Sequence, residues 1–330
     1  MRSRRSFLRA TAMGMAGGLL WRALPVQAQD SPRLRLVDTP TLTVGLEEAG
    51  KPQGFPVILL HGWPDDARAW DQVVPGLVEA GYRTIVPYLR GFGPTRFRQA
   101  SEPRGGEQAA LGQDVLDLAN ALELPRFAVA GYDWGNRAAG IVAALHPERV
   151  SAGVFIGGYT IQDTVTPPQP AAPERERAYW YQWYFNTERG RAGLAQNRRA
   201  LCRLLWESWS PAWRFSSETF DKTAVSFDNP DFVDVTIHSY RHRNGGAPGE
   251  PRFADTEQLL AKRPRITVPA IVMHGTTDGV AGAPPSEASD RTSFSGLLER
   301  RVVEGAGHFL PRERPAEVSS AILQVLRLGR

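Results

Sequence analysis

The sequence predicts a doubly wound, mostly parallel α/β sheet with helices on both faces and a helical segment inserted late in the chain. Short apolar runs alternate with segments of helical spacing through the first half of the chain. A glycine-bracketed turn joins one of these runs to a helix, and an aromatic helical block follows it. The length of 330 residues suits a sizeable core with one inserted subdomain.

The first half of the chain alternates between the two patterns. Strands are expected where short apolar runs occur, the first two as an opening hairpin, at residues 34–37, 41–46, 56–61, 84–86, 127–130 and 153–156. Helices are expected where apolar residues recur at intervals of three and four, at residues 70–80, 107–122 and 136–146.

The pattern changes near Tyr159, which suggests a second subdomain. Residues 160–246 hold five of the nine tryptophans and have helical spacing. Strand patterns return only afterwards, and a last helix is expected at the C-terminal end. The helical block is therefore predicted to be a cap over the carboxyl ends of the strands, where ligands bind in such sheets. The expected organisation is a core formed by residues 29–159 and 247–330, with residues 160–246 as the cap.

Residues 1–28 resemble a twin-arginine export signal. Arg4 and Arg5 precede an apolar stretch, residues 10–24, that is too short and too interrupted to span a bilayer. Residues 26–28, Val-Gln-Ala, offer a small-residue cleavage site. We therefore expect a bacterial protein that is exported to the periplasm or secreted, without a stable membrane anchor.

Charge and composition narrow the range of partners. The leader carries five of the 39 Lys and Arg residues and no acidic residue, so the rest of the chain holds 34 basic and 35 acidic residues. A near-neutral protein gives no compositional reason to expect a nucleic-acid partner. The sequence has neither a paired-histidine ligand motif nor a phosphate-binding glycine loop, so no metal and no cofactor is expected. A monomer and a homodimer both remain open.

The turn Gly131-Tyr132-Asp133-Trp134-Gly135 carries the most specific chemistry. It lies between the strand predicted at 127–130 and the helix predicted at 136–146, which is the arrangement of a nucleophile elbow. An aspartate takes the position where serine hydrolases carry serine. A carboxylate suits attack at a saturated carbon and forms an alkyl ester of the enzyme. This favours epoxides or alkyl halides over carboxylic esters as substrates.

Turnover of such an ester requires a base and an acid that orients it. Asp278 follows the strand predicted at 268–273, and His308 follows the strand predicted at 301–303. In elbow hydrolases the chain order is nucleophile, acid, histidine. The sequence therefore predicts a catalytic triad of Asp133, Asp278 and His308.

Residues 61–64, His-Gly-Trp-Pro, follow another predicted strand and supply the expected oxyanion hole. Their turn would direct the backbone N–H of Trp63 into the site beside that of Trp134. Both donors would stabilise the oxyanion formed when water attacks the Asp133 ester. The His61 ring is expected to form a hydrogen bond within this loop.

Together, these motifs resemble the α/β-hydrolase epoxide hydrolases, with haloalkane and fluoroacetate dehalogenases as relatives. The resemblance rests on residues 61–64, 131–135 and 307–309 and covers nearly all of the chain after the leader. It implies an α/β-hydrolase fold with a mostly parallel eight-stranded sheet and a helical cap. It also implies hydrolysis of an epoxide to a vicinal diol through an Asp133 ester and water activated by His308, with a small hydrophobic substrate.

The resemblance also assigns residues in the cap. Residues 181–185 are similar to the first cap motif of the family and make Tyr181 its tyrosine, while residues 238–241 are similar to the second and make Tyr240 its partner. Two tyrosines would donate hydrogen bonds to the oxygen of the opening epoxide. The residues expected around the substrate are Gln182, Trp183, His61 and Phe309.

Two alternatives stay open. Haloalkane dehalogenases hold the halide with indole N–H donors, and both Trp134 and Trp63 carry one. Fluoroacetate dehalogenases have an arginine after the nucleophile and a His-Trp pair in the cap, where this chain has Trp134 and a Gln182-Trp183 pair, so small carboxylates are disfavoured. The other alternative is a catalytically silent binding protein, which would have no need of His308.

Overall fold

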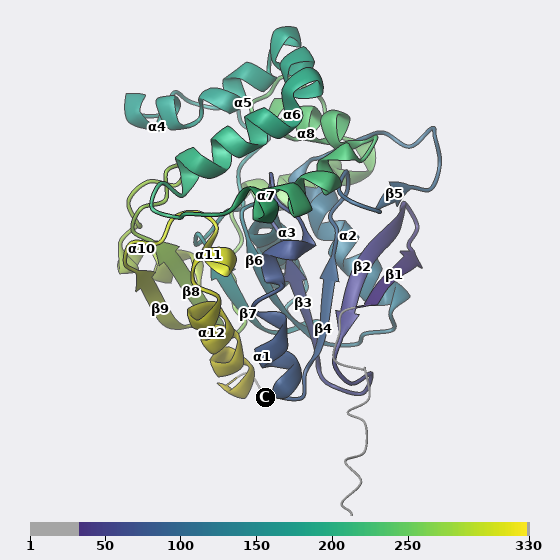
Figure 1. Ribbon diagram of the computed structural model, residues 1–330, viewed down its shortest axis with the longest axis vertical. Helices are drawn as coiled ribbons and strands as arrows, with labels where there is room; N and C mark the ends of the chain where they lie inside the picture. Colours follow the sequence, from purple (N-terminus) through teal and green to yellow (C-terminus); the bar gives the residue numbers. More distant parts are fainter. Residues whose placement is uncertain (1–32, 329–330) are drawn as a thin grey trace, which may run out of the picture.

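The computed structural model describes residues 33–328, and the predicted export signal lies outside them. Within the described residues the chain forms one mixed sheet covered by helices (Figure 1). The strands run in the order β1-β2-β4-β3-β6-β7-β8-β9, and the short β5 pairs with β2. The antiparallel pairs all involve β2, and the remaining pairs are parallel. This confirms the predicted fold class.

Except for the two-residue β5, which no apolar run predicts, the strands overlap the apolar runs that predict them. Their bounds are β1 Arg33–Asp38, β2 Leu42–Ala49, β3 Pro56–Leu60, β4 Arg83–Pro87, β5 Arg96–Phe97, β6 Phe127–Tyr132, β7 Val150–Ile156, β8 Ala270–Gly275 and β9 Leu297–Val303. The central strands β6, β7 and β8 are buried at every position. Continuous apolar sequence is typical of strands covered on both faces.

The helices of the core layer lie on both faces of this sheet (Figure 1). One pair, α1 with α12, packs together, and a second pair, α2 with α3, packs together. Their bounds, with those of the shorter elements around them, are η1 Ala67–Trp70, α1 Val74–Glu79, α2 Gln108–Ala121, α3 Trp134–Leu145, η3 Pro251–Phe253, α9 Ala254–Ala261, α10 Glu287–Ser293, α11 Leu310–Glu313 and α12 Pro315–Leu328. None of the described helices is both long and apolar enough to cross a membrane.

A group of helices between β7 and β8 lies over one end of the sheet (Figure 1). They are α4 Pro173–Ala178, α5 Trp180–Phe185, α6 Glu188–Trp209, α7 Ser217–Ala224, η2 Val225–Asp228 and α8 Phe232–Arg243. Their apolar side chains join the same buried cluster as the residues of the central strands. The helices therefore close over the carboxyl ends of the parallel strands, where the site residues lie.

Two expected elements differ from the structure. The continuous helix predicted over residues 70–80 is wrong: η1 ends at Trp70 and α1 begins only at Val74. Pro75 lies in the first turn of α1, where its missing N–H is tolerated, whereas a helix running through it would lose a hydrogen bond. Strand β9 begins at Leu297, four residues before the predicted start, and its charged residues fit an edge strand with one exposed face.

Candidate active site

The turn that holds Asp133 connects β6 directly to α3. Asp133 adopts φ 50° and ψ −119°, a backbone conformation that residues other than glycine rarely adopt. A Cβ atom at Gly135 would lie 2.2 Å from the Leu60 carbonyl oxygen, and one at Gly131 would lie 2.4 Å from the Gly135 carbonyl oxygen. The backbone packs so closely that only glycine fits at both positions, and the bend lifts the Asp133 carboxylate above the sheet.

The loop after β3 holds the Asp133 carboxylate from one side. The backbone N–H of Trp63 donates a hydrogen bond of 2.8 Å to Asp133 Oδ1. A Cβ atom at Gly62 would lie 2.6 Å from the Asp133 Cβ, so this approach also requires glycine. Burial opposes ionisation of Asp133, but the contacts with His308 and the Trp63 N–H lower its pKa below the ordinary value. The Asp133 carboxylate is therefore ionised.

The structure brings His308 and Asp278 together with Asp133. His308 Nδ1 lies 2.9 Å from Asp278 Oδ2, and His308 Nε2, which has no hydrogen-bond partner within residues 33–328, lies 3.7 Å from Asp133 Oδ2. The other Asp278 oxygen accepts hydrogen bonds from the backbone N–H groups of Val280 and Ala281, at 2.9 and 2.8 Å. Asp278 is thus fixed in the orientation that holds the imidazole toward Asp133.

The two carboxylates control the charge of His308. Burial opposes protonation of the imidazole, but Asp278 and then Asp133 more than offset it and raise the pKa of His308 to about 10. His308 is therefore an imidazolium while both carboxylates are charged. The pKa of Asp278 is lowered despite burial because the same imidazolium faces it.

A cap residue and a short helix fix the loop that carries His308. The His308 N–H donates 2.8 Å to Ser210 Oγ, at the end of α6. Glu313 in α11 accepts hydrogen bonds from the N–H groups of Gly307 and Phe309, at 2.8 and 3.0 Å. Phe309 is fully buried and stacks on Trp209, so its side chain supports the loop instead of lining the cavity.

The two predicted cap tyrosines come from different helices and pack against each other. Tyr181 in α5 and Tyr240 in α8 have ring centroids 5.3 Å apart, and both contact the Trp63 ring. Tyr181 lines the cavity and its hydroxyl accepts a hydrogen bond of 3.0 Å from Gln182, which lines the cavity too. The Tyr240 hydroxyl is buried without a partner among the described residues. Burial and the nearby negative charge raise the pKa of both phenols, so they remain protonated donors.

His61 and Trp183 lie outside the cavity. His61 is fully buried: its Nε2 accepts 3.0 Å from the Leu89 N–H, and its Nδ1 donates 2.9 Å to the Gly62 carbonyl. Burial lowers the pKa of His61 to about 4, so the ring is a neutral brace for the loop that holds Trp63. Trp183 is 40% exposed on the cap surface.

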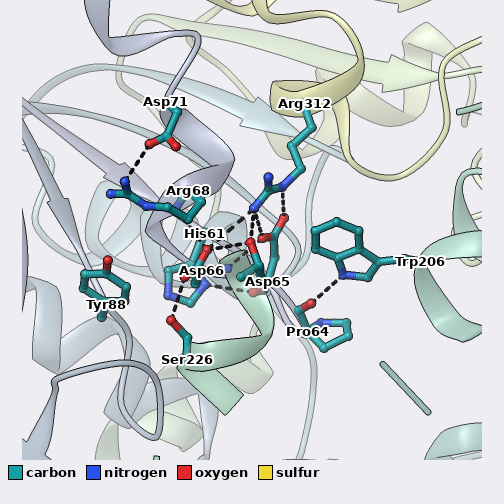
Figure 2. A network of polar contacts seen from close by, with 12 residues as sticks. His61, Pro64, Asp65, Asp66, Arg68, Asp71, Tyr88, Trp206, Ser226 and Arg312 are labelled. Carbon is teal, nitrogen blue, oxygen red and sulfur yellow. Dashed lines mark hydrogen bonds and ion pairs between the residues drawn. The ribbon is translucent and has the colours of Figure 1, made fainter. Parts of the chain in front are cut away.

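Buried polar side chains near the site form a network that no short sequence motif predicts (Figure 2). The Arg312 guanidinium in α11 donates two hydrogen bonds to the Asp65 carboxylate, which also accepts one from the Tyr132 hydroxyl. Asp66 accepts hydrogen bonds from Thr223 and Ser226 of the cap. The network joins the loops that carry the oxyanion donor, the nucleophile and the histidine, although its members are up to 247 residues apart.

A cavity of about 350 Å³ lies between the sheet and the cap, bordered by all three triad residues. Two indoles near it differ in their bonding: Trp63 Nε1 donates 2.9 Å to Thr236 of the cap, and Trp134 Nε1 has no partner among the described residues. Across residues 33–328, no group of three or more His, Cys, Asp or Glu side chains is arranged to hold a metal ion.

The chain is similar to known proteins over most of its length. Epoxide hydrolase A of Mycobacterium tuberculosis is 28% identical over 328 residues, which cover 90% of this chain and 98% of that protein. A crystal structure from Klebsiella pneumoniae, provisionally assigned as an epoxide hydrolase, is 43% identical with a TM-score of 0.86 and covers 89% of this chain and 97% of that one. A structure of potato epoxide hydrolase shares the fold, with a TM-score of 0.74 at 22% identity, and covers 90% of this chain and all of that one.

The family assignment follows from the extent of the match. The family model of the α/β hydrolase fold matches residues 56–315, which include every residue of the triad. The family predicted from the motifs is therefore confirmed. This chain belongs to the α/β-hydrolase fold family and is a hydrolase enzyme similar to epoxide hydrolases.

Proposed function

We propose that the enzyme opens an epoxide to a vicinal diol through an ester formed on Asp133. The observation that carries the proposal is the carboxylate at the nucleophile position, with His308 Nε2 3.7 Å from its Oδ2 and protonated tyrosines beside it in the cap. A serine at this position would direct the same scaffold toward acyl transfer. The similarity to proteins named epoxide hydrolases supports the same chemistry.

In the first step, the Asp133 carboxylate attacks one carbon of the epoxide ring. The C–O bond of that carbon breaks, and the oxygen leaves as a developing alkoxide. Tyr181 and Tyr240 are suited to donate hydrogen bonds to this oxygen because both phenols are protonated and buried. A tyrosine gives its proton to this oxygen and regains one from the His308 imidazolium, so the product of this step is an alkyl ester of Asp133 with one free hydroxyl, beside a neutral His308.

In the second step, water attacks the ester carbonyl, and the bond between the carbonyl carbon and the alkyl oxygen then breaks. The diol leaves with a proton from His308, and the Asp133 carboxyl returns a proton to His308 as it regains its charge. Forming the ester removes the negative charge of Asp133, which is one of the two charges that raise the pKa of His308. The pKa of His308 therefore falls after the first step, and the neutral imidazole can take a proton from water. The Trp63 N–H, which already binds Asp133 Oδ1, would stabilise the oxyanion together with the Trp134 N–H.

Carbon–halogen hydrolysis is the less favoured candidate. Halide binding by two indoles would need the Trp63 Nε1–H to face the cavity, but this group donates to Thr236. Of these two indoles, that of Trp134 has an Nε1 without a partner among the described residues. Assays that compare diol formation with halide release over matched substrate panels would separate the two reactions.

The mechanism is tested by single-turnover hydrolysis of an epoxide in H₂¹⁸O. The first diol should be unlabelled, because its new oxygen comes from Asp133, and the label should appear in Asp133 itself. The variant Asp133→Ala should form no diol while still binding the substrate. Label in the diol of the first turnover would instead demonstrate direct attack by water and refute the ester mechanism.

We also propose that the enzyme acts outside the cytoplasm, on the strength of the twin-arginine motif in residues 1–28. The test is fractionation of a bacterial host with and without a functional twin-arginine translocase. Replacement of Arg4 and Arg5 by lysine should keep the protein in the cytoplasm. Export that is unaffected by either change would refute this route.

A further inference from the structure

Two arginines border the active-site cavity without an acidic partner. Arg137 in α3 and Arg243 at the end of α8 both line the cavity that contains Asp133. Among the described residues, neither guanidinium forms an ion pair with a carboxylate within 4.0 Å. Arg137 is only 7% exposed, and Gln162 Oε1, 2.7 Å from its Nη1, is its hydrogen-bond acceptor. The buried Nε of Arg137 has no partner in the described part of the chain.

A buried guanidinium without a counter-charge is unfavourable, because desolvation of the cation is not offset. Burial, and then the positive charge of Arg243, lower the pKa of Arg137 to about 9. The carboxylate of Asp133 opposes this shift. That carboxylate becomes neutral when it forms an ester, so during the proposed cycle Arg137 loses the negative charge that opposes the shift.

The rest of the cavity wall supplies no replacement. Among the described residues that line it, the acidic ones are Asp133 and Asp278, and both belong to the triad. A third arginine, Arg175, is exposed and borders the same cavity, so the wall facing solvent is cationic as well. The apolar side chains of Ile156, Val280 and Leu310 also line the cavity.

We propose that the substrate is an epoxide that also carries a carboxylate, and that Arg137 and Arg243 bind this carboxylate. Arg137 lies in the first turn of α3, directly after the turn that carries Asp133, and both side chains border the same cavity. Guanidinium groups bind carboxylates through paired, charge-assisted hydrogen bonds. Trp134 takes the place of an arginine directly after the nucleophile, and the cations come from one turn further along α3 and from the cap. The proposal rests on the proposed function, because it names the substrate class of the same site.

The test compares terminal epoxides that carry a carboxylate with the corresponding primary amides, in a series of increasing chain length. We expect kcat/KM for the best acid to exceed that of its amide at least about tenfold. Arg137→Gln and Arg243→Gln should each reduce this ratio, mainly through KM of the acid. The matched control Arg199→Gln, which removes an exposed arginine paired with Asp228, should keep the wild-type ratio.

The possible outcomes separate this proposal from the proposed function. Turnover of the amides at the same rate as the acids would overturn the carboxylate site and leave epoxide hydrolysis intact. Absence of diol from every acid and every amide would overturn the proposed function itself. A ratio that is unchanged in both arginine variants would also contradict the assignment of these residues.

A binding measurement keeps the proposal testable if an arginine variant fails to fold. Octanoate and octanamide are titrated into the wild-type enzyme by calorimetry at low and high ionic strength. We expect octanoate to bind at least about tenfold more tightly than octanamide at low salt, with a difference that shrinks as salt rises. Equal affinities at low salt would refute a carboxylate site in the cavity.

Discussion

At the scale of single residues, the charge of Asp133 controls the state of His308. With Asp133 ionised, His308 is held protonated between two carboxylates, at 2.9 Å from Asp278 and 3.7 Å from Asp133. With Asp133 esterified, one of these charges is gone and the imidazole becomes a competent base. In the proposed mechanism, the same pair of groups thus provides a nucleophile in the first step and a base in the second.

Replacing His308 should stop the cycle at the ester. In His308→Gln we expect kcat to fall by about 10²–10⁴-fold, because general-base activation of water is lost. Mass spectrometry of the intact protein should then find one substrate mass added to the chain, and peptide mapping should locate it at Asp133. The control double variant His308→Gln with Asp133→Ala should carry no added mass. An adduct at any other residue would contradict the assignment of the nucleophile.

The raised pKa of His308 predicts a specific dependence of stability on pH. The folded protein keeps this proton up to about pH 10, whereas the unfolded chain releases it near the ordinary value of 6.5. The contribution is therefore complete below pH 6.5 and is lost as the pH rises toward 10, at up to about 1.4 kcal/mol per pH unit. Urea unfolding of wild type and His308→Gln over this range measures the difference. If the free energy of unfolding changed with pH in the same way for both proteins, the prediction would be wrong.

At the scale of elements, the first turn of helix α3 and the end of the neighbouring strand β3 meet with almost no space between their backbones. The Cβ position of Gly135 falls 2.2 Å from a backbone carbonyl of β3, which has no freedom to move aside. Gly140, in the same helix, would place its Cβ no closer than 3.6 Å to any side chain, which is ordinary contact. The first turn of α3 is therefore tightly constrained and its middle is not.

Replacing Gly135 and Gly140 separately by alanine gives a matched pair of variants. Gly135→Ala should destabilise the protein by more than about 3 kcal/mol and abolish activity, because the elbow must distort. Gly140→Ala should stabilise it by about 0.5–1 kcal/mol, as alanine is the better helix former. Chemical denaturation measures both effects. Similar stabilities of the two variants would mean that the elbow yields more easily than its geometry implies.

The elements that local sequence predicts best are those whose pattern is continuous. Strand β6, the elbow and α3 follow from an apolar run, two glycines and a helical pattern that are adjacent in the chain. Strand β9 starts before its predicted position because polar residues at a sheet edge do not mark a strand. The break before α1 depends on Pro75, which a periodic pattern alone does not register.

At the scale of the whole molecule, polar contacts buried between the cap and the core hold the site together. Trp206 Nε1 in α6 donates 2.6 Å to the Pro64 carbonyl, and Asp66 accepts from two cap hydroxyls. Arg312, in α11 directly after the loop that carries His308, donates to Asp65 of the core (Figure 2) and to Thr223 of the cap. Movement of the cap would therefore disturb the oxyanion loop and the triad together.

Removing Arg312 should test this coupling. Arg312→Leu leaves the buried Asp65 carboxylate without its cation, and we expect a loss of about 3–5 kcal/mol in the free energy of unfolding. The control Arg314→Leu, whose guanidinium contacts only backbone oxygens among the described residues, should change stability by less than about 0.5 kcal/mol. Thermal and urea unfolding measure both. Equal stabilities would mean that Asp65 is satisfied without Arg312.

The pattern of residues along the chain and the order of its motifs are enough to predict the α/β sheet, the place of the helical segment between its strands and the three residues, Asp133, Asp278 and His308, that the structure brings together. Those predictions depend on residues adjacent in sequence and on the fixed chain order of nucleophile, acid and histidine. The environments of His61, Trp63, Arg137 and Arg312 depend instead on partners that are 25 to 247 residues away. Burial and electrostatic pairing are properties of the packed chain. The neutral state of His61, the hydrogen bond of the Trp63 indole and the lack of an acidic partner for Arg137 among the described residues are therefore decided only by the tertiary structure.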